Sequence, residues 1–261
     1  MSKPQLEYLL LEEKGNTAIV TINRPEAMNA LSTEVWRELK ATVDYLNHQE
    51  DIRAVILTGA GDKAFAAGAD VKNLLVKKGK ENLSSFARDF LLGMQNSRLV
   101  FIAAINGYAF GGGLELSMFC DIRIASTTAL LGLPETNLGL LPGAGGTQKL
   151  VRLTNESIAK QVILGGRILS AEEGVASGLI MQVADPAELL TVAEKVAKRV
   201  TAKGPIAVML AKRVINSAND VDIHSGLLFE NLAFSVLLDT NDKVEGINAF
   251  LEKRKAEFKS E

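Results

Sequence analysis

The stretch that decides the fold of this chain is Asn106-Gly-Tyr-Ala-Phe-Gly-Gly-Gly-Leu-Glu-Leu-Ser-Met-Phe-Cys-Asp121. Three successive glycines lead into an almost wholly apolar run, Leu114 to Met118, which is predicted to form a buried helix. Glu115 lies inside this run. Burying an ionised carboxylate costs several kcal/mol unless it is hydrogen-bonded, paired or protonated. Glu115 is therefore a candidate for acid/base chemistry.

A second carboxylate, Glu135, follows Pro134 in a similar setting of apolar residues and glycines that runs from Leu131 to Gln148. Two titratable groups in such surroundings are typical of acid/base catalysis. The alternative is a structural role, in which Glu115 caps a backbone group or pairs with a cation such as Arg123.

The glycines that precede Glu115 predict a site for a ligand oxygen. Backbone N–H groups at the start of the helix have no intrahelical partners, and the helix dipole adds to them, so the start of the helix favours negative charge on a carbonyl oxygen. A second N–H could come from the small-residue turn Ala64-Phe-Ala-Ala-Gly-Ala-Asp70. The alternative is that Gly111–Gly113 serve only close packing.

These segments resemble a known family, the enoyl-CoA hydratase (crotonase) family. The residues that carry the resemblance are Lys63–Asp70, Asn106–Glu115, Pro134-Glu135 and Pro142-Gly-Ala-Gly-Gly-Thr-Gln148, with further matches at Asn23–Pro25, Met28–Ala30 and Phe250–Lys255. The resemblance therefore covers nearly the whole chain.

The resemblance implies a role for each matching position. Ala69 and Gly112 would supply the two oxyanion-hole N–H groups, Glu115 and Glu135 the catalytic carboxylates, and Gly143 would help to position the water. Coenzyme A would enter across Ala66–Val71. Its binding residues would be Lys63, Ala67, Gly68, Asp70, Val71 and Lys72. No metal or redox cofactor is expected, because coenzyme A is part of the substrate.

The family implies an α/β fold, a spiral of ββα units followed by helices that pack subunits into trimers, often paired into hexamers. We expect a catalytic core over residues 1–185 and a helical trimerisation subdomain over 186–261. The residue pattern agrees with this division, because strands are predicted only in the first part. The predicted strands are Tyr8–Lys14, Thr17–Ile22, Ala54–Thr58, Val100–Ile105, Asp121–Ala125 and Ile180–Ala184. The predicted helices are Ser32–Asn47, one from the capping box Ser170–Glu173 to Gly178, Pro186–Lys203, Pro205–Ser217, Asp222–Leu238 and Asn241–Lys255.

Composition excludes several classes of function. The 261 residues carry 29 Lys and Arg against 31 Asp and Glu, a net charge of −2, so there is no global basic footprint for nucleic acid. The single cysteine, Cys120, rules out an internal disulfide and fits a reducing compartment. The longest apolar stretch is broken by Asn106 and glycines, so no membrane helix is expected. His48 and His224 have no second histidine at metal-ligand spacing. We therefore expect a cytoplasmic protein without a zinc site.

The resemblance is closest to an enoyl-CoA hydratase, a carbon–oxygen lyase that adds water across the C2=C3 bond of a 2-enoyl-CoA to give a 3-hydroxyacyl-CoA. Such enzymes serve fatty-acid or branched-chain acyl-CoA breakdown. The presence of both carboxylates disfavours a Δ3–Δ2 enoyl-CoA isomerase, which typically keeps only the acid at the Glu135 position. Hydration of a branched or acidic substrate such as 3-methylglutaconyl-CoA stays open. A noncatalytic RNA-binding role, known for some relatives, is disfavoured by the balanced charge.

Overall fold

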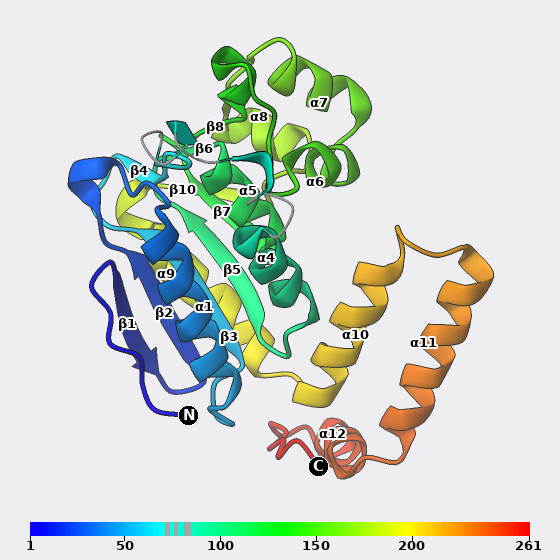
Figure 1. Ribbon diagram of the computed structural model, residues 1–261. Coiled ribbons are helices and arrows are strands. Elements are labelled where there is room, and N and C mark those ends of the chain that lie inside the picture. Colours follow the sequence, from blue (N-terminus) through cyan, green and yellow to red (C-terminus); the bar gives the residue numbers. More distant parts are fainter. Residues whose placement is uncertain (71–73, 76–77, 81–84) are drawn as a thin grey trace.

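A computed structural model of the chain describes residues 1–70, 74–75, 78–80 and 85–261, and its strands form two sheets (Figure 1). The six-stranded sheet contains, in spatial order, β1 (Leu9–Lys14), β2 (Thr17–Ile22), β3 (Ala54–Gly59), β5 (Val100–Ile105), β7 (Ile122–Ser126) and β10 (Gln182–Ala184). The four-stranded sheet contains β4 (Ala64–Ala66), β6 (Tyr108–Phe110), β8 (Leu130–Gly132) and β9 (Leu169–Ser170). All six predicted strands are confirmed, with ends within two residues of those expected.

The larger sheet is parallel apart from its antiparallel β1–β2 hairpin. Its central strands β3 and β5 are buried along their whole length. Both faces of these strands are covered, which explains why they are continuous apolar runs rather than alternating ones. Alternate residues of β3 separate into the two cores: Val55 and Leu57 join the main core, and Ala54 and Ile56 join the second.

A helix packs on each of these cores. Helix α1 (Thr33–Asn47) begins after Ser32, whose hydroxyl accepts the N–H of Val35, so the predicted N-cap is confirmed. It buries Leu39 and Leu46 in the main core. Helix α9 (Leu189–Thr201) covers the opposite face, where its apolar residues meet those of β3 and β5.

The chain passes from one sheet to the other in a repeating order. Strand β3 leads to β4 and helix α4 (Phe86–Asn96), β5 leads to β6 and α5 (Gly112–Phe119), and β7 leads to β8 and the short helix η2 (Pro134–Leu138). This order confirms the expected spiral of ββα units. It also places Ala69 after β4 and Gly112 after β6, two neighbouring strands of the smaller sheet.

The remaining elements complete the core. They are η1 (Pro25–Ala27), α6 (Gly146–Leu153), α7 (Glu156–Ile163), α8 (Ala171–Ala176) and η3 (Pro186–Glu188). Helix α8 opens with the predicted capping box, in which Ser170 and Glu173 bond to each other's backbone N–H groups. It ends before Gly178, which has φ 81°.

Turns of the spiral touch where glycine leaves room for a neighbouring backbone. An ideal Cβ would lie 2.2 Å from the Ala64 oxygen at Gly59, 2.2 Å from the Lys63 oxygen at Gly107, and 2.0 Å from the Ala66 oxygen at Gly113. No side chain fits at such distances. Strand β4 and the residue before it, Lys63, are therefore the common support of three neighbouring segments.

The last three helices are α10 (Pro205–Ser217), α11 (Ile223–Leu238) and α12 (Asn241–Leu251), and they extend away from the sheets (Figure 1). Helix α11 has no buried residue in this single chain. Helix α9 packs on the larger sheet instead. The expected division of the chain at 185/186 stays a prediction. Among the described residues, no helix is both long and apolar enough to span a membrane.

Candidate active site

Glu115 lies in the first turn of α5 and is only 3% exposed. Its Oε1 accepts two backbone N–H groups, from Ala144 and from Gly146, each at 2.8 Å. Gly146 is the first residue of α6, so the carboxylate lies at the positive end of that helix. The buried carboxylate is therefore held by peptide groups.

These surroundings bring the pKa of Glu115 to about 7. Burial is the largest cause and raises the pKa, because the charged form loses its hydration. The two N–H groups lower the pKa, and the nearby charge of Glu135 raises it further. A carboxylate with a pKa near 7 exists in both protonation states at neutral pH, which suits it to accept and return a proton.

The alternative partner for Glu115 is engaged elsewhere. Arg123 is buried, and its guanidinium donates to the carbonyl oxygens of Leu179 at 2.8 Å and Ser117 at 3.4 Å, and also to that of Cys120. Two of these carbonyls belong to the C-terminal end of α5, where a cation complements the helix dipole. Arg123 therefore caps α5 at the end opposite to Glu115.

Glu135 lies in η2, directly after Pro134. It is half-buried, and burial raises its pKa. Its Oε2 is buried without a hydrogen-bond partner among the described residues. An ideal Cβ on Gly111 would lie 2.9 Å from Glu135 Oε1, so this carboxylate faces the start of α5. An unsatisfied buried acceptor beside a glycine turn is typical of a site prepared for a ligand.

The two expected oxyanion donors face the same small space. An ideal Cβ on Gly112 would lie 3.8 Å from the Ala69 nitrogen and 4.0 Å from Glu115 Oε2. Gly112 is the first residue of α5, so its N–H has no carbonyl partner within the helix. Ala69 is exposed and pairs with Leu31 in a short parallel bridge, in which the Leu31 N–H donates to Gly68. The structure thus brings Ala69, Gly112 and both carboxylates together.

The other expected site residues lie around this space or outside it. The Ala67 N–H donates to the Met28 oxygen, and Gly68 has φ 98° beside Phe110, so these two shape the turn before Ala69. Asp70 lies 3.9 Å from Arg24, and Lys63 is exposed directly before β4. Val71 and Lys72 lie outside the described residues. Gly143 is exposed one residue before Ala144, and its expected role in positioning water stays a prediction.

Sequence reasoning missed the donors that hold Glu115. Ala144 and Gly146 lie in the segment Pro142–Gln148 that resembles the family, where only Gly143 was given a role, yet their N–H groups fix the carboxylate. Gly145, between them, has φ 109°, which turns successive N–H groups toward one acceptor. The pair Gly145-Gly146, at the N-cap and first position of α6, was the signal for such an anion-binding turn.

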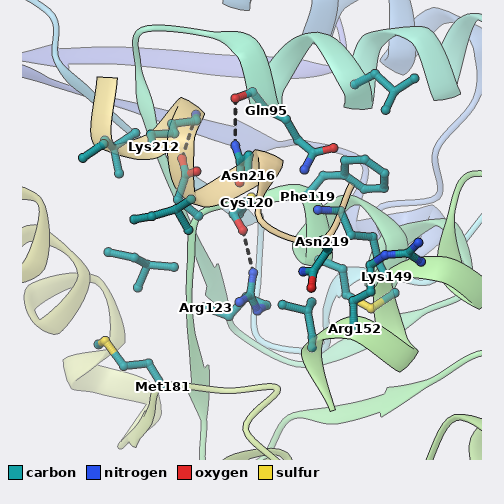
Figure 2. A pocket seen from close by; sticks show the side chains of 18 of the residues that line it. Gln95, Phe119, Cys120, Arg123, Lys149, Arg152, Met181, Lys212, Asn216 and Asn219 are labelled. Carbon is teal, nitrogen blue, oxygen red and sulfur yellow. Dashed lines mark hydrogen bonds and ion pairs between the residues drawn. The ribbon is translucent and has the colours of Figure 1, made fainter. Parts of the chain in front are cut away.

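A cavity of about 960 Å³ lies elsewhere, at the opposite end of α5 (Figure 2). Its lining includes Phe119, Cys120 and Arg123 from the end of α5 and the start of β7, Lys149 and Arg152 from α6, and Lys212 and Asn216 from α10. Neither Glu115 nor Glu135 lines it. Among the described residues, no group of three His, Cys, Asp or Glu side chains could hold a metal ion.

Comparison with known proteins agrees with this geometry. The sequence profile of the family described as Enoyl-CoA hydratase/isomerase matches residues 12–261. The chain is 41% identical to the short-chain-enoyl-CoA hydratase of Clostridium acetobutylicum and 42% identical to the crotonyl-CoA hydratase of Syntrophomonas wolfei, over 97% of this chain and 98% of each relative. The chain belongs to the enoyl-CoA hydratase/isomerase family.

The fold of the enoyl-CoA hydratase/isomerase family is found here along the whole chain. A crystal structure of an enoyl-CoA hydratase from Bacillus anthracis superposes with a TM-score of 0.94 at 40% identity, covering 98% of this chain and 100% of that one. The expected crotonase-like fold is therefore confirmed. Membership of the enoyl-CoA hydratase/isomerase family implies an acyl-CoA thioester as the substrate.

Proposed function

We propose that this protein is an enoyl-CoA hydratase, which adds water across the C2=C3 double bond of a 2-enoyl-CoA to give a 3-hydroxyacyl-CoA. The observation that carries the proposal is the meeting of two carboxylates and two backbone donors at the start of α5. The names of the hydratases from C. acetobutylicum and S. wolfei support the same reaction.

The thioester oxygen binds between the N–H groups of Ala69 and Gly112. These donors strengthen as negative charge grows on the oxygen, so they stabilise the enolate-like transition state more than the bound substrate. Withdrawal of electrons toward the oxygen also makes C3 electrophilic. Hydration is redox-neutral, so it needs no redox cofactor, and the two N–H groups polarise the carbonyl in the way that a Lewis-acid metal would.

The two carboxylates divide the proton transfers. Glu115, in its ionised form, takes a proton from the water whose oxygen bonds to C3. Glu135, in its protonated form, gives a proton to C2 as the double bond is lost. Burial raises the pKa of Glu135, and this favours the protonated form that the step needs. One water is consumed, and the proton left on Glu115 restores Glu135, so the site returns to its starting state.

Replacement of each carboxylate by its amide tests these roles. With crotonyl-CoA as substrate, Glu115→Gln and Glu135→Gln should each reduce hydration by about 100-fold or more, because each loses a proton-transfer group. Glu115→Gln should retain some deuterium exchange at C2, whereas Glu135→Gln should lose both reactions. Near-normal hydration by either folded variant would refute the paired mechanism. C2 exchange that survives only in Glu135→Gln would reverse the assignment.

The oxyanion donors have a test of their own. Gly112→Pro removes one N–H at a first helical position, where proline is tolerated. Loss of one such donor costs about 3 to 4 kcal/mol in the barrier, so hydration should fall by a factor of about 100 to 1,000. Full activity in folded Gly112→Pro protein would remove Gly112 from the site.

The alternative reactions within the enoyl-CoA hydratase/isomerase family predict different substrates. A Δ3–Δ2 isomerase needs only one shuttling base, and the buried, peptide-held Glu115 favours hydration over it. Hydration of 3-methylglutaconyl-CoA would require the same two carboxylates. A panel of straight, branched and acidic enoyl-CoA thioesters, followed by loss of the conjugated-thioester absorbance, separates these reactions. The pathway and the cytoplasmic location stay predictions.

We also propose that the chain self-associates into trimers or dimers of trimers through α10–α12. Helix α11 exposes a series of large apolar side chains, Ile223, Leu227, Leu228, Phe229, Leu232, Phe234 and Val236. So large an apolar surface is typical of a subunit interface. Sedimentation as a monomer at micromolar concentration would contradict this proposal.

A further inference from the structure

Residues 67–69 follow β4 and form an arm that carries the Ala69 N–H. The chain segment around Asn29 holds this arm. The Ala67 N–H donates to the Met28 oxygen at 3.0 Å, and the Leu31 N–H donates to the Gly68 oxygen at 2.8 Å. Met28 and Leu31, on either side of Asn29 in the sequence, thus bond to the two residues that precede Ala69. Any change in the backbone at Asn29 would move both bonds.

Asn29 itself is 1% exposed and adopts a left-handed backbone conformation, with φ 56°. Its Oδ1 accepts the Arg24 N–H at 3.0 Å. Its Nδ2 donates to the Ala60 oxygen at 3.0 Å and to the Ala64 oxygen at 2.7 Å. Every polar atom of the side-chain amide is therefore used, so the amide has one orientation only.

A second amide meets the first at the same carbonyl group. The Asn106 Nδ2 donates to the Ala64 oxygen at 3.3 Å and to the oxygens of Gly59 and Gly61. An ideal Cβ on Gly59 would lie 2.7 Å from Asn29 Nδ2, so the two amides and β3 are in close contact. The start of β4 is thereby fixed from two directions.

The other oxyanion donor rests on the same strand. An ideal Cβ on Gly113 would lie 2.0 Å from the Ala66 oxygen, so α5 lies directly against β4. Gly112 precedes this contact, and Ala69 follows β4 by three residues. The separation between the two donors is therefore set by how β4 and the arm after it are held.

We propose that Asn29 is a positioning residue for hydration: its amide holds Ala60 and Ala64, and its neighbours hold Ala67 and Gly68, so that the Ala69 N–H meets the thioester oxygen together with Gly112. This inference rests on the proposed oxyanion hole. Asn29 touches no reacting atom, and acts through the backbone of the arm. A displacement of about 1 Å in such a group can cost about 100-fold in rate.

The variant Asn29→Gly tests this role, because glycine adopts the left-handed conformation freely and only the amide is lost. We expect the kcat for crotonyl-CoA to fall about 10- to 100-fold, with a smaller change in the affinity for the CoA product. A bound dienoyl-CoA, whose absorption shifts to longer wavelength when its carbonyl is polarised, should shift less than in the wild type. The pH midpoint of the reaction should not move, because Ala144 and Gly146 still hold Glu115.

The matched control is Asn216→Ala, which removes another bond from an asparagine amide to a backbone oxygen, that of Gln95 at 2.9 Å on α4. It should keep the kcat and the spectral shift.

Wild-type values of both in folded Asn29→Gly protein would overturn the proposal. If Asn29→Gly does not fold, Asn29→Asp provides the same measurements. Failure of both to fold would overturn the proposal too, since Asn29 would then be a general folding residue. Absence of hydration and of any shift in the wild type would instead refute the oxyanion hole.

Discussion

The two ends of helix α5 each carry a largely buried carboxylate, and the two are held in different ways. At the start of the helix, Glu115 accepts only backbone N–H groups among the residues that the structure describes. Just past its end, Asp121 accepts the Phe101 N–H at 2.8 Å and the ammonium group of Lys212 at 2.9 Å. The first carboxylate has neutral donors and the second has a cation.

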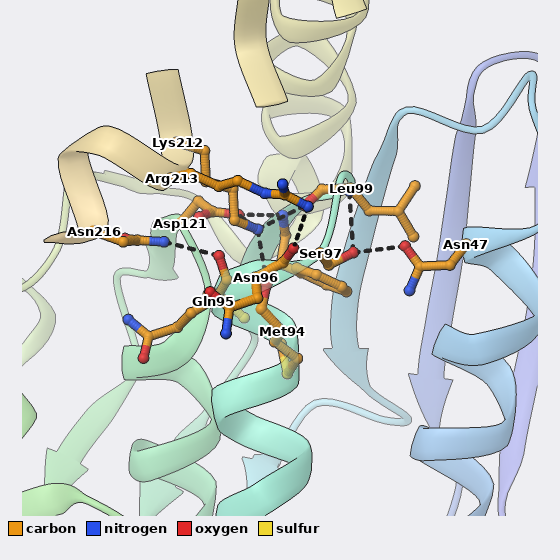
Figure 3. A network of polar contacts seen from close by, with 12 residues as sticks. Asn47, Met94, Gln95, Asn96, Ser97, Leu99, Asp121, Lys212, Arg213 and Asn216 are labelled. Carbon is orange, nitrogen blue, oxygen red and sulfur yellow. Dashed lines mark hydrogen bonds and ion pairs between the residues drawn. The ribbon is translucent and has the colours of Figure 1, made fainter. Parts of the chain in front are cut away.

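The cation is itself fully bonded. Lys212, from α10, also donates to the oxygens of Met94 and Leu99, so its three N–H groups have three acceptors (Figure 3). Burial raises the pKa of Asp121, and the charge of Lys212 opposes that rise. A carboxylate paired with a cation keeps its charge and fixes structure. A carboxylate held by peptide groups alone is free to gain and lose a proton, and this difference separates the structural end of α5 from its catalytic end.

The largest expected effect comes from breaking the structural end. Lys212→Met should lower the free energy of unfolding by about 3 to 5 kcal/mol, because Asp121 would keep a poorly solvated charge without its partner. Denaturant unfolding at a fixed protein concentration measures the loss. The double variant with Asp121→Asn should recover much of it, since the uncompensated charge is then removed. A loss below about 1 kcal/mol in the single variant would show that Asp121 behaves as a surface ion-pair residue.

Removal of the charge at the catalytic end should raise the free energy of unfolding instead of lowering it. The folded pKa of Glu115, about 7, lies above its ordinary value of 4.5, so the folded state binds more protons between these pH values. Wild-type stability therefore falls as pH rises through this window, by on the order of 3 kcal/mol in total. Glu115→Gln has no such cost, so its advantage over the wild type should be absent near pH 4 and complete near pH 8. Denaturant unfolding at both pH values measures it, and an advantage that shrinks with rising pH would contradict the comparison.

The titration of Glu115 should also appear in the pH dependence of the rate. Glu115 must be ionised to accept the proton of water, so kcat/KM for crotonyl-CoA should fall about tenfold per pH unit below pH 7. Because Glu135 must be protonated, the rate should also decline as pH rises through the raised pKa of Glu135. The Lys212→Met variant should keep the acidic midpoint, since Lys212 bonds at the other end of α5. An acidic midpoint near 4.5 would show that Glu115 is not the base.

The smallest effect should come from a neighbour of Lys212. Arg213, one residue along α10, makes an exposed contact of 3.3 Å to the Asn96 oxygen. Arg213→Ala should change the free energy of unfolding by no more than about 0.5 kcal/mol, as is usual for exposed positions. A loss comparable to that of Lys212→Met would mean that the whole face of α10, and not the buried ion pair, carries the stabilisation.

The sequence predicts the parts that depend on local pattern. The apolar runs of β2 and β5 and the Ser32 cap of α1 follow from neighbouring residues, and the structure has them where expected. The meeting of Glu115 and Glu135 with Ala69 and Gly112 was predicted from motifs. The donors that hold Glu115 were not, because a peptide N–H is present at almost every position and only the fold selects two of them. The bond between Lys212 and Asp121 was missed for another reason, since a lysine on a surface helix is normally solvated.

The closest contacts of β4 have a consequence at the level of the gene. Gly59, Gly107 and Gly113 each face a backbone oxygen at a distance where no Cβ fits. A change in the third base of a glycine codon is silent, and a change in the first or second base gives a stop or an amino acid that carries a Cβ atom. At these three positions, therefore, the genetic code offers no conservative missense mutation, and any such change disturbs the strand on which both halves of the oxyanion hole depend.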